Sequence, residues 1–374
     1  MAVMQPSPAR GEDRLAVVDA LRGFALFGIL LANVLYWSGW GMVTDAQRLQ
    51  WAGPIVDQWQ YRFHHLLVDG KFYTLFSFLF GAGFALQLER LLRRGQDGLR
   101  IYRRRVLVLL GIGLVHSFLL WDGDILTLYA LLGLVLPVFH RWSTRGLVLG
   151  GLALVFVVPM VGVAAFAWRG WAPQNAFYEL SIRIAEAFGV NPAADQVLAW
   201  MQAEDPRSWA AWVASGPAYS WGLRIEAWRI PKVLGIMMIG MAAGRGLAEG
   251  TLLANRVLLK RVLLVGVLVG LPCSLAYALQ RGQTQSSASS LLGTVPLAMA
   301  YAAGFALAWP YLSRWLRLFA APDPAQTDAI EQQHAEHRVR QVVGQRHAQG
   351  PMEALWRRWT YGSDGVANPP TPAV

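Results

Sequence analysis

The residues best suited to chemistry lie in an apolar hairpin between positions 111 and 129. His116 is surrounded in sequence by leucine, valine and phenylalanine, and the carboxylates Asp122 and Asp124 follow it. Imidazole titrates near neutral pH, so it can accept and return a proton in acyl or phosphoryl transfer when a partner holds its tautomer. Asp122 or Asp124 could be that partner. The simpler alternatives are that Asp124 caps the next helix and that His116 hydrogen-bonds a neighbouring helix.

A second set of polar residues interrupts the apolar stretch 15–37, which contains Asp19, Arg22 and Asn33. On a helix, Asp19 and Arg22 lie on one face and can form an ion pair. Ionisable groups are costly in hydrocarbon, so they usually face a protein interior or an aqueous cavity. These residues therefore predict either a structural ion pair or, together with Asn33, the wall of a polar site.

A third candidate segment begins with Lys71 and contains Ser77, Gly81 and Gly83. Lys71 either extends its ammonium group to the outer membrane interface or takes part in the site. Ser77 either hydrogen-bonds a neighbouring helix or acts as a nucleophile. The two glycines predict close packing between helices rather than contact with a ligand.

The composition indicates a membrane protein. Hydrophobic residues make up 55% of the 374 residues and charged residues only 15%. The net charge of +10 does not indicate a nucleic-acid partner, because the basic residues cluster beside apolar spans. Cys273 is the single cysteine and lies in an apolar run, so neither a disulfide framework nor a thiolate metal site is expected. The expected partner is the lipid bilayer.

The hydropathy pattern predicts an all-α, polytopic integral membrane bundle of about eight helices, each of about 20 residues. Residues 1–14 precede the bundle of residues 15–312, which includes an external loop at 169–229, and a polar tail follows at 313–374. The positions of the eight expected spans are 15–37, 71–92, 105–121, 124–140, 146–168, 230–247, 257–279 and 290–312.

Short basic loops predict the orientation, because Lys and Arg concentrate on the cytoplasmic side. The segment 90–105, which ends in Arg103, Arg104 and Arg105, is the strongest of these loops. It predicts that both termini are cytoplasmic and that loops 38–70 and 169–229 are external. The three arginines are explained by topology, although they could also attract the phosphates of a donor substrate.

Four groups of residues carry a resemblance to a known family. They are Asp19, Arg22, Gly23, Gly28 and Asn33; Lys71, Phe72, Ser77 and Gly81; His116 with Gly123, Asp124, Ile125 and Leu126; and Gly350, Pro351, Met352, Glu353, Trp356, Arg357, Thr360, Tyr361 and Gly362. These groups resemble the bacterial YeiB family of membrane proteins, also called domain of unknown function 418. The resemblance implies a multi-pass protein of the bacterial inner membrane. By resemblance, that family is grouped with transmembrane acyltransferases, among them the lysosomal glucosaminide N-acetyltransferase and sugar O-acyltransferases.

The resemblance implies acyl transfer from a thioester such as acyl-CoA to an extracytoplasmic hydroxyl or amine of the cell envelope. His116 would be the general base and Asp124, or less favourably Asp122, would orient it. No permanently bound cofactor or metal is expected. The remaining cavity residues would be Asp19, Arg22, Asn33, Lys71, Ser77 and Asp122.

Two other functions are compatible with the sequence. Buried charges could line the path of a small-molecule transporter or exporter, although no internal repeat supports one. The protein could also be catalytically inactive, because segment 320–349 is polar where family members continue with apolar helices. His334 and His337 in this segment are expected to belong to a solvated tail. The oligomeric state stays open, and a homodimer is compatible with the sequence.

Overall fold

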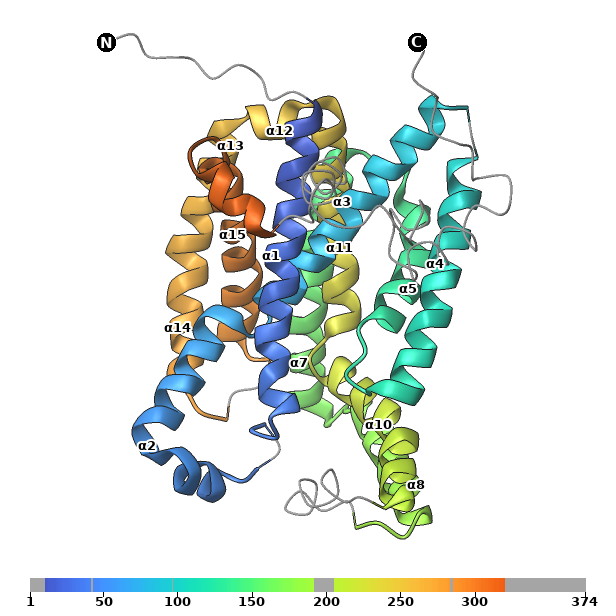
Figure 1. The fold of residues 1–374 in the computed structure, drawn as a ribbon, viewed down its shortest axis with the longest axis vertical. Coiled ribbons are helices and arrows are strands. Elements are labelled where there is room, and N and C mark those ends of the chain that lie inside the picture. The colour runs from blue at the N-terminus through green and yellow to red at the C-terminus, as the bar shows by residue number, and fades with distance from the viewer. Residues whose placement is uncertain (1–10, 42, 96, 192–204, 283–284, 320–374) are drawn as a thin grey trace, which may run out of the picture.

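The computed structural model describes residues 11–41, 43–95, 97–191, 205–282 and 285–319. In these residues all regular elements are helical, which confirms the expected all-α class (Figure 1). Most of the expected polar tail, including segment 320–349 with His334 and His337 and the closing motif 350–362, lies outside the described residues. Residues 1–10 of the expected N-terminal segment also lie outside them.

Several of the helices contain or end in a turn of π- or 3₁₀-helix, and some continuous rods therefore carry two or three labels. The α-helices are α1 (Gly11–Trp37), α2 (Asp45–Phe63), α3 (Lys71–Arg93), α4 (Gly98–Val115), α5 (Leu126–Val135), α6 (Thr144–Leu152), α7 (Val158–Arg169), α8 (Gln174–Ala187), α10 (Pro206–Glu226), α11 (Arg229–Glu249), α12 (Thr251–Ala254), α13 (Arg256–Val265), α14 (Leu271–Leu279) and α15 (Ala288–Leu316). The shorter turns are η1 (His64–Val68), η2 (His116–Leu120), η3 (Leu136–Phe139), η4 (Ala153–Val157), η5 (Gly266–Gly270) and η6 (Arg317–Phe319).

Six helical stretches of the described chain are long and apolar enough to cross a membrane, which indicates a multi-pass membrane protein. The expected count of about eight is not reached by these criteria. Two expected spans do not meet the criteria. The stretch α4–η2 begins with four arginines and is therefore too highly charged, and α5–η3 (Leu126–Phe139) is too short. The six stretches are Ala16–Trp37, Asp45–Arg93, Thr144–Arg169, Arg229–Glu249, Arg256–Leu279 and Ala288–Phe319.

The side chains on the outside of the bundle also suit a membrane. The rods α6–η4–α7 and α13–η5–α14 expose large aliphatic and aromatic side chains along their length, such as Met160, Val161, Phe166, Leu264 and Leu268. A water-soluble protein rarely exposes so continuous an apolar surface. Contact of this surface with lipid would remove it from water.

The two ends of the bundle differ in composition (Figure 1). At one end, called here the basic end, α1 begins and the turns α3–α4, η3–α6 and α12–α13 contain or adjoin arginines, among them Arg94, Arg141 and Arg256. At the opposite end, called here the cap end, α2, α8 and α10 lie beyond the tips of the long helices. The expected external segments 38–70 and 169–229 therefore contain ordered helices rather than loops alone.

The last helix extends past the expected boundary at residue 312. The helix α15 continues to Leu316, and η6 follows to Phe319. The ring of Phe319 packs against Phe24 and Phe27 of α1. The backbone of Phe319 lies so close to Gly23 that a β-carbon there would be 1.7 Å from its carbonyl oxygen. Residues 313–319 thus belong to the bundle.

The centre of the bundle is a direct contact between α3 and α11. A β-carbon at Gly81 would lie 1.9 Å from the carbonyl oxygen of Met237, and one at Gly240 would lie 2.0 Å from that of Phe78. Small residues allow this approach, and packing replaces the hydrophobic effect as the force between helices in lipid. The expectation that Gly81 allows close helix packing is confirmed. Gly83, in contrast, faces the guanidinium of Arg22.

We expect Gly240→Ala to lower the free energy of unfolding by about 1–3 kcal/mol, because a methyl group cannot fit against the backbone of α3. The matched control is Gly111→Ala on α4, where no other described part of the chain lies within 4 Å of the added β-carbon. Alanine should there be neutral or stabilise by up to about 1 kcal/mol. The free energy of unfolding of both variants is measured by titrating the detergent-solubilised protein with sodium dodecyl sulfate and monitoring its circular dichroism. Equal stability of the two variants would contradict this account.

Candidate functional site

The structure brings His116 and Asp124 together at the cap end of the α4–α5 hairpin. The Nδ1 atom of His116 lies 3.2 Å from Oδ1 of Asp124, at ion-pair distance but without the alignment of a hydrogen bond. Asp124 is buried, whereas the side chain of His116 is 32% exposed. His116 begins the π-helical turn η2, and such turns in helices are frequent at functional sites. Of the two carboxylates considered as its partner, Asp124 is the one placed beside it.

Asp124 also caps the next helix. Its two carboxylate oxygens accept hydrogen bonds from the backbone N–H groups of Leu126, at 3.0 Å, and Thr127, at 2.8 Å. These bonds hold the carboxylate in one orientation and satisfy donors at the start of α5. The capping alternative is thus confirmed, and it is compatible with a role beside His116 because the cap fixes where the imidazole meets its partner.

Asp122 faces a different set of groups. Its Oδ1 accepts a hydrogen bond of 2.9 Å from the hydroxyl of Tyr36 on α1, and its Oδ2 one of 3.4 Å from Ser220 on α10. Burial raises the pKa of Asp122, although these hydrogen bonds and the charge of Arg224 oppose the shift. Asp122 therefore joins the hairpin turn to two other helices.

Arg224 on α10 is a site residue that the sequence did not single out. It is buried, and its Nη2 donates a short hydrogen bond to the backbone carbonyl of Asp124. Its Nη1 is also buried and has no hydrogen-bond partner within the described part of the chain. Burial lowers the pKa of Arg224 to about 10, so it is still a cation at neutral pH. The sequence placed Arg224 in the expected external loop 169–229, and nothing in that segment predicted its contact with Asp124.

Aromatic rings enclose one side of His116. The ring of Trp121 lies edge-on to the imidazole, with centroids 6.1 Å apart, and also contacts Tyr36 and Trp37 at the end of α1. Asn33 lies one turn before Tyr36 on α1 and is half-buried. The structure thus places Asn33 toward the same end of the bundle as the hairpin.

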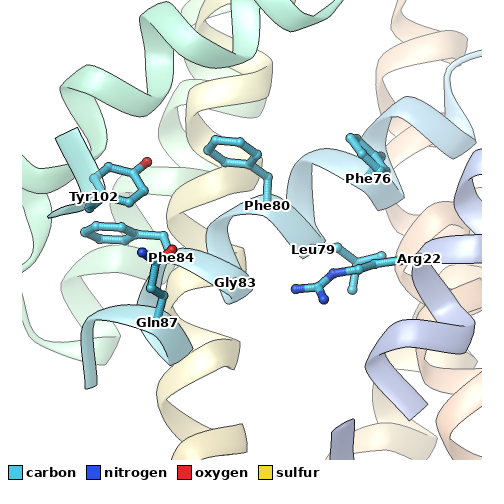
Figure 2. Close-up of a pocket in the computed structure, with 8 residues that line it drawn as sticks. All are labelled: Arg22, Phe76, Leu79, Phe80, Gly83, Phe84, Gln87 and Tyr102. Carbon is cyan, nitrogen blue, oxygen red and sulfur yellow. The ribbon is translucent and has the colours of Figure 1, made fainter. Parts of the chain in front are cut away.

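Asp19 and Arg22 lie elsewhere, in the half of α1 nearer the basic end. They form the expected ion pair, with 2.8 Å between Nη1 of Arg22 and Oδ1 of Asp19, and both side chains are about half exposed. Figure 2 shows the guanidinium of Arg22 directed toward α3. It lines a cavity of about 240 Å³ with Phe76, Leu79, Phe80, Gly83, Phe84, Gln87 and Tyr102. The expected residues therefore do not form a single compact site.

The interpretation of Lys71 as an interfacial side chain is wrong. Lys71 is 0% exposed, and its ammonium group donates a 2.6 Å hydrogen bond to the backbone carbonyl of His65. Hydropathy placed the end of a span at Lys71, but α2 and η1 continue the helical stretch. The ammonium group contacts His65 of η1 and lies over the ring of Tyr277 on α14. Ser77 forms a 2.7 Å hydrogen bond with the hydroxyl of Tyr129 on α5, as its helix-to-helix alternative predicted.

The arginines considered for donor binding lie at the basic end. Arg103 and Arg104 are exposed on α4, and Arg105 is partly buried. In the described residues no group of three or more His, Cys, Asp or Glu side chains is arranged to hold a metal ion.

Comparison with known proteins gives three bacterial relatives. The chain is 36% identical over 169 residues to "Uncharacterized protein YxaH" of Bacillus subtilis, covering 43% of this chain and 41% of that protein. It is 34% identical over 174 residues to "Uncharacterized protein YeiB" of Escherichia coli, covering 43% and 42%. It is 39% identical over 151 residues to an uncharacterized 39.9 kDa protein from an amylase 3' region of Bacillus acidopullulyticus, covering 40% and 41%.

These relatives support a YeiB-like family. The chain matches about two fifths of the length of each of them. No family model matches the chain, and no solved structure matches it.

We expect Asp122→Asn to be more stable than the native protein at neutral pH. An acid whose pKa is raised in the folded state destabilises that state when ionised, and this cost disappears as the pH falls through the raised pKa toward the ordinary value. Asparagine keeps an acceptor for Tyr36 and carries no charge. Thermal unfolding in detergent across this pH range measures the difference, which should vanish at low pH. A variant less stable than the native protein at every pH would contradict this expectation.

Proposed function

We propose that the chain is a YeiB-like membrane acyltransferase, which transfers an acyl group from a thioester donor such as acyl-CoA to an extracytoplasmic hydroxyl or amine. The observation that carries the proposal is the pairing of His116 with the buried, doubly hydrogen-bonded carboxylate of Asp124. A carboxylate beside Nδ1 favours the tautomer in which Nε2 is free to accept a proton.

The reaction requires a single proton shuttle. Nε2 of His116 removes the proton of the acceptor hydroxyl or amine as the acceptor atom attacks the thioester carbonyl carbon. The carbon–sulfur bond then breaks, and His116 returns the proton to the leaving thiolate. Asp124 stabilises the imidazolium that forms between these steps. Arg224 is a positioning residue, because it binds the backbone carbonyl of Asp124 and so holds the turn that carries the carboxylate.

The donor would approach from the basic end. The cavity beside Arg22 is also lined by Tyr102, which Arg103, Arg104 and Arg105 follow on α4. Exposed guanidinium groups next to a cavity suit the phosphates of acyl-CoA. An acyl group would then have to pass along α1 and α3 to reach His116, so the two substrates would meet from opposite faces.

A transporter is the second candidate, and it is favoured by the burial of Lys71 and Lys232 among the helices, near the half-buried Asp69. Charged residues inside a membrane bundle often line a path for ions or solutes. Uptake of a solute into proteoliposomes without chemical change would favour transport, whereas a covalently acylated product would favour transfer.

The proposed topology places the basic end in the cytoplasm of a bacterial inner membrane, with eight helical rods threading the bilayer. The rods α4–η2 and α5–η3 complete the eight because they pack as a hairpin against α3 and α11. A cysteine replacing Gln50 on α2 should then react with a membrane-impermeant maleimide in intact cells, in a Cys273→Ser background. A cysteine replacing Thr251 on α12 should react only after permeabilisation. The reverse pattern would invert the proposed orientation.

The transfer itself is tested by replacing His116. We expect His116→Ala to lower the rate of acyl-CoA-dependent transfer at least about 100-fold, since a general base contributes about 10²–10⁴. Asp124→Asn should lower kcat more than it changes KM and should shift the pH profile of kcat. The control is His140→Ala at the other end of the same hairpin, where Nδ1 contacts the carbonyl of Pro137. Full activity of His116→Ala in the purified protein would remove His116 from the mechanism.

A further inference from the structure

A second polar cluster lies at the cap end between α3, α11 and α14, and its two lysines are buried. It consists of Asp69, Lys71, Arg229 and Lys232, and is called here the Lys71–Lys232 cluster. Lys71 is 0% and Lys232 is 4% exposed. Asp69 attracts both ammonium groups, while Arg229 repels Lys232. Asp69 and Arg229 are half-buried. The two buried lysines and Arg229 outnumber the single carboxylate of Asp69, so the cluster carries an excess of positive charge.

Asp69 itself is fully engaged by neutral donors. Its Oδ2 accepts a 2.9 Å hydrogen bond from the hydroxyl of Tyr277, and its Oδ1 accepts one of 2.7 Å from Nε2 of Gln285. The carbonyl oxygen of the Gln285 side chain in turn accepts from Arg229, at 3.2 and 3.3 Å. The carboxylate is therefore fixed in place, and its charge is not directly bonded to either lysine.

The two ammonium groups have hydrogen-bonding capacity to spare. Each carries three N–H donors. Within the described residues, Lys71 donates at 2.6 Å to the carbonyl of His65, and Lys232 makes a long contact of 3.4 Å to the backbone carbonyl of Gln285. Both ring nitrogens of the neighbouring His64 are also buried without a hydrogen-bond partner in this part of the structure. Buried donors without acceptors are costly, so an additional acceptor would be favourable here.

Helix ends add to the positive potential. The helices α3 and α11 begin at Lys71 and Arg229, and α15 begins nearby after Ser287. The N-terminus of a helix carries a partial positive charge, which falls off within one turn. Gly70 allows the approach of α15, because it adopts a φ of 78° and a β-carbon there would lie 2.7 Å from the side chain of Thr294. The cluster thus combines side-chain and backbone charges of one sign.

A cavity lies near the cluster at the cap end, although none of the four cluster residues lines it. The cavity has a volume of about 400 Å³ and lies between α7, the start of α8 and the end of α10, and its lining includes Trp228, Ser286 and Ser287. Trp228 directly precedes Arg229, and Ser286 directly follows Gln285. The cavity is therefore next to the segments that carry Arg229 and Gln285, and Glu226 also lines it.

We propose that the Lys71–Lys232 cluster binds an oxyanion, meaning a phosphate, sulfate or carboxylate group. The anion accepts hydrogen bonds from Lys71 and Lys232 and neutralises the excess positive charge. Asp69 limits the affinity, because its carboxylate repels the incoming anion. The source of the oxyanion is either a small soluble ion or the headgroup of an anionic lipid. This binding goes beyond acyl transfer and does not require it.

The test measures thermal unfolding of the full chain in a neutral detergent, with inorganic phosphate titrated against sodium chloride at constant ionic strength. The Tm of the native protein should rise and saturate. Lys232→Gln should raise the apparent Kd at least about tenfold, since it removes charge-assisted hydrogen bonds. Asp69→Asn should lower the apparent Kd for phosphate, because the substitution removes the negative charge that repels the anion. The control Lys260→Gln, which changes an exposed lysine on α13, should match the native protein.

The lipid arm replaces detergent with nanodiscs of phosphatidylcholine alone or with phosphatidylglycerol. A rise in Tm with phosphatidylglycerol but not with phosphate would identify a lipid headgroup as the source. Lys232→Gln and Asp69→Asn are expected to change the apparent Kd in opposite directions. This distinguishes a change in anion binding from misfolding, since a misfolded variant does not bind more tightly. His116→Ala should keep the response, so loss of transfer and loss of anion binding are distinguishable. No saturable response in either arm, or an unchanged response in Asp69→Asn, would overturn the proposal.

Discussion

The direct contact between the backbones of α3 and α11 determines where the polar groups of this bundle lie. Gly81 and Gly240 bring the two helices so close that neither has room for a side chain at the contact. Because both helices begin at the cap end, this contact places Lys71 near Lys232 and leaves α5 and α15 to pack on either side. In lipid, such packing has no help from hydrophobic burial, so it depends on small residues and on hydrogen bonds such as Ser77 to Tyr129.

Both polar clusters lie at the cap end and are electrostatically linked. Arg224 binds the Asp124 turn and is repelled by Arg229 of the Lys71–Lys232 cluster. Arg224, near the end of α10, is therefore affected by the charges of both clusters. An oxyanion near Arg229 would weaken that repulsion and so favour the position of Arg224 that supports Asp124. Both the Lys71–Lys232 cluster and the Asp124 turn that faces His116 thus depend on compensation of buried charge.

The sequence predicted best what depends on neighbouring residues. The contact of His116 with Asp124 follows from a hairpin turn too short to separate them, and the Asp19–Arg22 pair follows from helical spacing. Contacts between distant segments were not predictable, which is why Arg224 and Lys232 were missed. Lys71 was misplaced for a related reason. Hydropathy indicates where a helix ends, but it does not reveal that η1 and α14 contact the side chain at that end.

The separation of Asp19 and Arg22 from His116 constrains any mechanism. Both groups lie on or beside α1, yet the ion pair belongs to the half nearer the basic end, whereas Tyr36 and Trp37 meet the hairpin at the cap end. A helix rises about 1.5 Å per residue, so Arg22 and Tyr36 are about 20 Å apart along α1. No side chain bridges that distance. If both regions serve one reaction, a substrate must extend between them, which a long thioester donor with a flexible arm does and a small solute does not.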